Sequence, residues 1–198
     1  MYAQLKQDID VLKVYKKGYY VEIGASDGIE LSNTYLLEIN NWKGICVEPI
    51  PTRYDKLIQN RPNAICYNKA VYHTSDLEVL FTISNRYDLL SGVTDYLTTY
   101  KDLVMFDHTD ILVQTKTLND ILIDAKAPSF IEYLSVDTEG TELEILKSVD
   151  LKKYKFGIID VEHNYEEPRR SDIRKLLLDN GYELQLENKW DDRYVCCK

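Results

Sequence analysis

A glycine-containing acidic loop is the first segment of the chain whose residue types and spacing could do chemistry. It follows the β-rich run 19–23 and reads Glu22-Ile23-Gly24-Ala25-Ser26-Asp27-Gly28. Doubly wound sheets bind their ligands in such loops, beyond the carboxyl ends of the strands. Gly24 has no Cβ and lets the backbone come close to a ligand, and Gly28 permits a tight turn toward the next helix.

The acids of this loop indicate a cationic ligand. A dinucleotide-binding loop reads G-x-G-x-x-G and holds a pyrophosphate, which Glu22 and Asp27 would repel. Both carboxylates suit a ligand that carries an amino group and a sulfonium, and S-adenosylmethionine (SAM) is such a ligand. An ordinary turn between a strand and a helix also explains an E-x-G-x-x-x-G pattern, so the loop alone does not decide.

Another acid stands at the end of the next strand-like run. Residues 45–47 are apolar and lead into Glu48-Pro49, 26 positions after Glu22. In the two-strand nucleotide-binding layout, an acid at this position binds ribose hydroxyls, and one carboxylate can accept from both. A surface acid is the alternative, but the glycine loop at the right separation favours the ribose role.

Two later strand ends carry further acids that we expect at the same edge of the sheet. The first reads Val136-Asp137-Thr138-Glu139-Gly140 and opens a helix, where the helix dipole alone also favours an acid. The second, at 158–164, supplies Asp160, Glu162, His163 and Asn164. A histidine beside carboxylates can act as a general base near neutral pH. A structural histidine with satisfied hydrogen bonds is the alternative.

Strand-like and helix-like segments alternate along most of the chain. This order predicts one domain over residues 1–198, an α/β fold with a mostly parallel, Rossmann-like sheet and helices on both faces. Strand-like runs at 182–186 and 193–196 flank a turn and predict a C-terminal antiparallel hairpin. The segment 84–110 is polar and rich in tyrosine, and we interpret it as a substrate loop or a surface excursion.

Composition narrows the classes of partner. The formal net charge is -9, which disfavours nucleic acid and an anionic membrane surface as partners. No apolar run approaches the roughly 20 residues of a membrane span, and no signal peptide is visible, so a cytoplasmic protein is expected. The chain has four cysteines, Cys46, Cys66, Cys196 and Cys197. They are expected to be reduced rather than part of a zinc site or disulfide scaffold.

Together these motifs resemble the FkbM family of methyltransferases. The likeness extends from about residue 19 to residue 195. It rests on the loop 22–28, the V-E-P-I-P block at 47–51, the N-K-A-V block at 68–71, the V-D-T-E-G-T-E block at 136–142 and the terminal hairpin. The resemblance implies a seven-stranded class I methyltransferase fold and SAM as the methyl donor. Members commonly O-methylate sugars, glycan units and natural-product hydroxyls.

The resemblance also implies the residues of the SAM site. They are Gly24, Ala25, Ser26, Gly28, Glu48 and Asp137, with Ala70 and Val71 under the adenine. Glu22, Asp27 and Pro49 complete the predicted cofactor-binding set from the same two motifs. The family more often carries Asn where Ser26 stands, and the segment 84–110 matches it poorly. The acceptor therefore stays open, because such segments usually carry the substrate contacts.

Methyl transfer to oxygen requires alignment of donor and acceptor and removal of the hydroxyl proton. One hypothesis makes His163 the base, with Asp137, Glu139 or Glu162 orienting it or the acceptor. A second uses a divalent cation such as Mg²⁺ to lower the pKa of the acceptor hydroxyl. Its hard oxygen ligands would be Asp137, Asp160, Glu162 and Asn164.

Two other functional classes compete with the methyltransferase interpretation. One is a methyltransferase-like module that binds proteins without chemistry, which the intact glycines and acids disfavour. The other is a nicotinamide-dependent oxidoreductase, which the missing third glycine and the terminal hairpin disfavour. The acceptor is expected to be a small molecule or a glycan, and the 16 tyrosines offer flat faces with polar tips that suit sugars.

Overall fold

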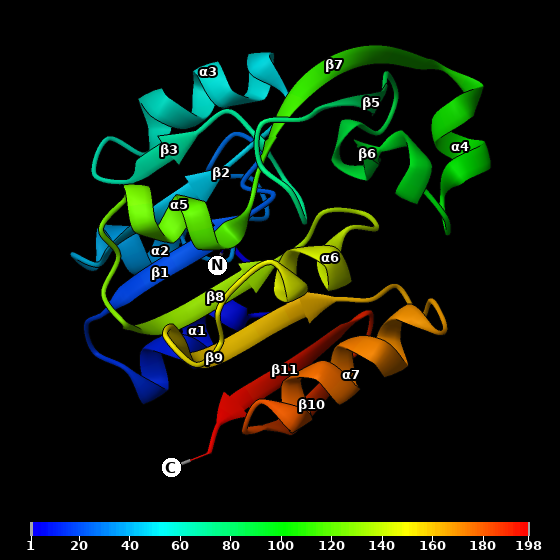
Figure 1. Cartoon of the computed structure of the whole chain (residues 1–198). Coiled ribbons are helices and arrows are strands. Elements are labelled where there is room, and N and C mark those ends of the chain that lie inside the picture. Colours follow the sequence, from blue (N-terminus) through cyan, green and yellow to red (C-terminus); the bar gives the residue numbers. More distant parts are fainter. Residues whose placement is uncertain (1, 198) are drawn as a thin grey trace.

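Seven strands form the main sheet, in the order β10-β11-β9-β8-β1-β2-β3 (Figure 1). The computed structural model describes residues 2–197. The strands are β1 (Tyr19–Ile23), β2 (Lys43–Val47), β3 (Ile65–Tyr67), β8 (Phe130–Val136), β9 (Lys155–Glu162), β10 (Tyr182–Asn188) and β11 (Asp191–Cys196). The first five are mutually parallel, whereas β11 pairs antiparallel with both β9 and β10. The predicted sheet and its C-terminal hairpin are confirmed.

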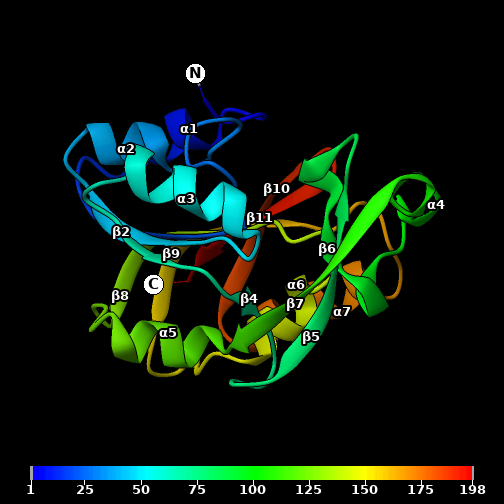
Figure 2. The same cartoon turned by 90° about the horizontal axis from the view of Figure 1, so that it is seen from above.

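Helices cover both faces of this sheet. Figure 2 shows one layer with α1 (Gln7–Val14), α2 (Tyr35–Ile39) and α3 (Pro51–Asn60), and on the opposite face α5 (Leu118–Asp124), α6 (Glu142–Lys147) and α7 (Arg169–Asp179). The alternation of elements in the sequence did not indicate α1. None of the helices within residues 2–197 has the length and apolar character that crossing a membrane requires.

The central strands are buried on both sides, because alternate residues of a strand point to opposite faces. On β1, Val21 and Ile23 pack with α5, α6 and α7, whereas Tyr20 packs with α1, α2 and α3. The same alternation puts Ile159 in the first core and Ile158 in the second. Polar strand residues at the carboxyl ends are therefore held in place by a rigid apolar frame.

A small second sheet lies beyond the carboxyl ends of the main strands (Figure 2). Its order is β4-β7-β5-β6, formed by β4 (Ala70–Val71), β5 (Glu78–Ser84), β6 (Gly92–Val93) and β7 (His108–Lys116). Between β5 and β7 the chain also forms the short 3-10 helices η1 (Asp88–Leu90) and η2 (Thr94–Tyr96), and α4 (Lys101–Phe106). The two ends of the segment 84–110 are thus anchored, because β5 and β7 pair along their length from Glu78 and Gln114 to Ser84 and His108.

The four cysteines are free thiols, as expected for reduced residues. Cys46 and Cys66 are neighbours in register on β2 and β3. Cys46 is fully buried, and burial raises the pKa of its thiol well above the usual value. Cys66 and Cys196 are partly buried, and Cys197 is exposed rather than part of the core.

Helix α5 gives a direct test of the local folding argument. The Thr117 side chain accepts a hydrogen bond from the backbone N–H of Asp120 at 3.0 Å and caps the helix. Loss of such a cap costs about 1 kcal/mol. We expect Thr117→Ala to lower the free energy of unfolding by about that amount in urea denaturation, and Thr117→Ser to cost only a few tenths. Equal losses for both variants would contradict the capping role.

Candidate active site

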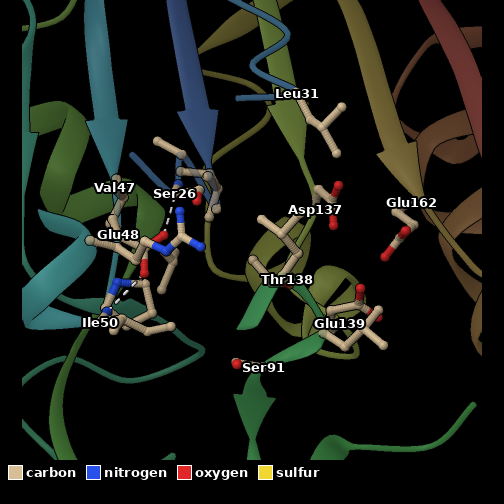
Figure 3. Close-up of a pocket in the computed structure, with 18 of the residues that line it drawn as sticks. Ser26, Leu31, Val47, Glu48, Ile50, Ser91, Asp137, Thr138, Glu139 and Glu162 are labelled. Carbon is tan, nitrogen blue, oxygen red and sulfur yellow. Dashed lines mark hydrogen bonds between the residues drawn. The ribbon is translucent and has the colours of Figure 1, made fainter. Parts of the chain in front are cut away.

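One large cavity of about 460 Å³ opens between the carboxyl ends of the main strands and the small sheet. Its volume lies within the range of about 300–1,000 Å³ that is usual for small-molecule sites. The main-sheet side includes the loop 24–26, residues 47–50 and residues 137–139, and the small-sheet side includes Phe81, Tyr87, residues 89–91 and Val93. Figure 3 shows Glu48 and Ser26 at one end, and Asp137, Glu139 and Glu162 at the other.

Glu48 holds the glycine loop against the end of β2. One of its carboxylate oxygens accepts the Ser26 N–H at 2.8 Å, and the other accepts the Ile50 N–H at 2.8 Å. The backbone N–H groups of Gly24 and Ala25 both donate to the Val47 carbonyl at 3.0 Å. This end of the cavity, formed by Ser26, Val47, Glu48 and Ile50, is called the Glu48 end below. The protein itself therefore holds the Glu48 carboxylate in position.

Two buried polar atoms of the lining residues, carboxylates aside, have no hydrogen-bond partner among residues 2–197. They are the Ser26 hydroxyl oxygen and the Asn33 amide oxygen, and both residues line the cavity. An unmade hydrogen bond in a buried site costs free energy. Apolar Val47, Ile50 and Val71 lie beside them in the lining. The mixture of orphaned polar atoms and apolar surface suits a polar ligand with a flat apolar part.

Glu22 belongs to the scaffold of the loop and does not line the cavity. Its carboxylate accepts the Asn33 N–H at 2.7 Å and the Thr34 hydroxyl at 2.7 Å, and lies 3.3 Å from a guanidinium nitrogen of Arg61. Arg61 also pairs with Glu38 and donates to the Gly28 carbonyl at 3.1 Å. The charge of Glu22 is therefore engaged by the protein itself.

Gly24 and Gly28 are both required, but for contacts within the protein. Both have positive φ, 86° and 83°. A Cβ on Gly24 would lie 1.8 Å from the Asp137 carbonyl oxygen, and one on Gly28 would lie 2.6 Å from Arg61. Asp27 accepts the N–H groups of the two residues at 29 and 30, each at 2.9 Å, and like Gly28 does not line the cavity.

Asp137, Glu139 and Glu162 come together at the opposite end, and are called the acidic cluster below. Each offers a carboxylate oxygen, and these oxygens all lie within 4.8 Å of one another. Asp137 and Glu139 follow β8, whereas Glu162 is the last residue of β9. The parallel pairing of β8 with β9 brings both strand ends to the same edge.

Burial and mutual repulsion raise the pKa values throughout the acidic cluster. Asp137 is exposed toward the cavity, but protein surrounds its other sides; desolvation, followed by the nearby Glu142, raises its pKa to about 6. Burial and then the charge of Asp137 raise the pKa of Glu139 to about 9, and the same causes raise the pKa of Glu162 well above the usual range. Asp191, also in the lining, has its pKa raised by burial to about 8. The charged forms are thus poorly compensated.

Glu142 holds the turn that presents the acidic cluster. One carboxylate oxygen accepts the Thr138 N–H at 3.1 Å, the Thr138 hydroxyl at 2.9 Å and the Gly140 N–H at 2.9 Å. Its other oxygen lies 3.5 Å from Arg169. Glu139 itself has a positive φ of 58° within this turn.

The structure does not bring His163 to the cavity. Its side chain is buried, with Nε2 at 3.3 Å from Asp192, and Nδ1 accepts the Tyr165 N–H at 2.9 Å. Asp160 is also remote from the lining, since Arg193 pairs with both its oxygens at 2.7 Å. Asn164 donates to Glu139 at 3.2 Å. Of the four cation ligands suggested by the sequence, only Asp137 and Glu162 belong to the acidic cluster, and Glu139 joins them.

Most of the predicted cofactor-binding residues line the cavity together. They are Gly24, Ala25, Ser26, Glu48, Pro49, Ala70, Val71 and Asp137. Sequence reasoning did not anticipate Arg61, Glu142, Asp191 or the wall that the small sheet provides. The T-E sequence at 141–142 lies in a recognised motif block, but nothing local in the sequence links Arg61 to Glu22, 39 positions earlier.

Solved structures with the same fold are distant in sequence. The METTL16 methyltransferase domain has a TM-score of 0.52 at 11% identity, with 96% of this chain and 64% of that chain covered. Precorrin-6y C5,15-methyltransferase from Geobacter metallireducens has 0.50 at 12%, covering 96% and 83%. TrmK from M. capricolum, solved with S-adenosylhomocysteine, has 0.50 at 10%, covering 96% and 66%. No curated protein matches the sequence.

The strand order and the site at the carboxyl ends of the parallel strands define a class I methyltransferase fold. The sequence also matches the Methyltransferase FkbM domain over residues 22–184. The chain belongs to this family of SAM-dependent methyltransferases, as the motifs predicted.

A pair of glycines tests the close approach of β1 to Asp137. Gly24 and Gly181 have nearly equal φ values, 86° and 84°, but a Cβ on Gly181 would meet nothing within 4 Å. We expect Gly181→Ala to cost about 1–2 kcal/mol through left-handed strain alone. Gly24→Ala should cost a further ~1–3 kcal/mol, because backbone must move. Equal losses in denaturant unfolding would contradict the close approach.

Proposed function

We propose that the protein transfers the methyl group of SAM to a hydroxyl oxygen of a sugar, a glycan unit or another small molecule. The observation that carries the proposal is the division of one cavity into two chemically different ends. The Glu48 end offers a fixed carboxylate beside apolar surface. The acidic cluster offers carboxylates that pair with no basic side chain among residues 2–197. A donor at the first end and an acceptor at the second would meet within the same cavity.

The residues at the Glu48 end fit the adenosyl part of SAM. Glu48 would accept from the ribose hydroxyls, and Val47, Ile50 and Val71 would contact the adenine. The orphaned oxygens of Ser26 and Asn33 would gain partners from the polar parts of the ligand. When bound, SAM supplies a methyl group already activated by the positive sulfonium.

The acidic cluster fits a hydroxyl acceptor. A hydroxyl can donate to a carboxylate, and its proton must leave as the new C–O bond forms and the C–S bond breaks. We assign orientation of the acceptor and acceptance of its proton to Asp137, Glu139 and Glu162 in preference to His163, because these carboxylates line the cavity. The balanced products are a methyl ether, S-adenosylhomocysteine and one proton.

Charge also supports a small or uncharged acceptor over nucleic acid. Phosphates would approach the carboxylates of the acidic cluster and Asp191 on a chain of net charge -9. Nucleic-acid binding draws its affinity mainly from neutralised phosphates, and this site would repel them. A purely protein-binding module has less support, because most of the predicted cofactor-binding residues line one cavity of ligand size.

Calorimetric titration with S-adenosylhomocysteine tests the donor end. We expect micromolar binding to the wild type and a loss of about tenfold to hundredfold in Glu48→Gln, since hydrogen bonds to a charged group contribute about 1.5–3 kcal/mol. Asp55→Asn removes one charge from an exposed position of α3 and should bind as the wild type does. Absence of binding to the wild type would overturn the enzyme proposal and favour the interaction module.

Methyl transfer from radiolabelled SAM to a panel of methyl glycosides tests the acceptor end. Glu162→Gln should lower turnover by about 10²–10⁴-fold, the usual contribution of a proton-accepting group. It should leave the affinity for S-adenosylhomocysteine within about twofold, because Glu162 lies away from the Glu48 end (Figure 3). Transfer to RNA transcripts but to no glycoside would contradict the proposed acceptor, as would full turnover in the variant.

A further inference from the structure

The oxygens of the acidic cluster have the separations of ligands around one ion. One oxygen from each of Asp137, Glu139 and Glu162 lies within 4.8 Å of the other two. Metal–oxygen distances are about 2.0–2.1 Å for Mg²⁺ and about 2.3–2.6 Å for Ca²⁺. Two oxygens on opposite sides of one such ion therefore lie about 4.0–5.2 Å apart, and adjacent ones lie closer. The separations of these carboxylate oxygens are compatible with one shared cation.

Glu162 supplies an independent observation. Its side chain is only 8% exposed, and its Oε2 has no hydrogen-bond partner among residues 2–197. Figure 3 shows the carboxylate pointing toward Asp137 and Glu139 across the end of the cavity. A buried carboxylate oxygen without a donor is costly, and the protein surroundings supply it with none. A cation in the cavity would supply the missing partner.

The protein also leaves the charge of the cluster without a counterion. Within the part of the chain that the structure describes, no basic side chain lies within 4.0 Å of the carboxylate oxygens of Asp137, Glu139 or Glu162. Two arginines in this region interact with other carboxylates. Arg169 lies beside Glu142, and Arg193 pairs with Asp160. The amide of Asn164 donates to Glu139, which orients that carboxylate but does not neutralise it.

We propose that Asp137, Glu139 and Glu162 bind one hard divalent cation of the Mg²⁺ type, with its remaining coordination positions open to the cavity. Three carboxylates with no nitrogen or sulfur ligand favour Mg²⁺, Mn²⁺ or Ca²⁺ over Zn²⁺ or copper. The ligand set differs from the one that the sequence suggested, because Asp160 is neutralised by Arg193 and Glu139 takes a place in the set.

The use of the cation rests on the proposed function. An ion with open positions at this end of the cavity can bind the acceptor hydroxyl directly, lower its pKa and fix its oxygen toward the methyl group. The proton would then pass to a cavity water or to a carboxylate oxygen that does not bind the ion. Acceptors with two neighbouring hydroxyls would gain most, because both oxygens can occupy open positions of one ion.

The test uses chelator-treated full-length protein and Mg²⁺, Mn²⁺ or Ca²⁺ alone. We expect calorimetry to show one site, and millimolar Mg²⁺ to raise the midpoint of thermal unfolding. Glu162→Gln should weaken binding at least tenfold, while Asp55→Asn should leave it unchanged. In chelator, Glu162→Gln should unfold at or above the temperature of the wild type, because one repelling charge is gone. No binding by the wild type, or equal binding by Glu162→Gln, would overturn the proposal.

A parallel titration with S-adenosylhomocysteine in chelator separates this proposal from the proposed function. Binding of S-adenosylhomocysteine together with full methyl transfer in chelator would refute the proposed cation site and leave the proposed methyltransferase function standing. The opposite outcome is Mg²⁺ binding that is lost in Glu162→Gln, with no binding of S-adenosylhomocysteine under any condition. It would support the cation site and refute the proposed donor site.

Discussion

The close approach of Gly24 to the Asp137 carbonyl is the constraint on which the rest of the site depends. It brings the ends of β1 and β8 so close that no side chain fits between them, since a Cβ on Gly24 would lie 1.8 Å from that oxygen. The glycine loop then turns toward β2, where Glu48 and Val47 hold it through backbone N–H groups. The residues after Asp137 turn the other way, toward β9. One backbone contact thus divides the cavity into its two ends.

The sequence predicted the features that depend on neighbouring residues or on strand order. The glycine loop, Glu48 and the V-D-T-E-G-T-E block are local motifs, and parallel strands necessarily bring their carboxyl ends to one edge. The position of His163 was not predictable in the same way. It follows Glu162 directly, and a shift of one residue at a strand end decides whether a side chain meets the cavity or Asp192. Glu142 and Arg61 act through contacts made only on folding.

Buried charge is compensated within the sheet layers but not at the cavity beyond the carboxyl ends of the strands. Glu22, Glu38 and Arg61 form a closed network, and Asp160 with Arg193 forms another, so that buried charges compensate each other. At the cavity, raised pKa values are shared by Asp137, Glu139, Glu162 and Asp191. Groups whose pKa values are perturbed in this way cluster at functional sites.

The small sheet is joined to the acidic turn by backbone contacts. A Cβ on Gly140 would lie 2.3 Å from the carbonyl of Tyr96 in η2, and one on Gly92 would lie 3.3 Å from the carbonyl of Glu139. The small-sheet side of the cavity and the turn that carries the acidic cluster are therefore in direct contact. Grafting the segment 84–110 from another family member would therefore change the cavity wall and shift the turn that carries the acids at the same time. A substitution at this contact in one segment calls for a matching substitution in the other.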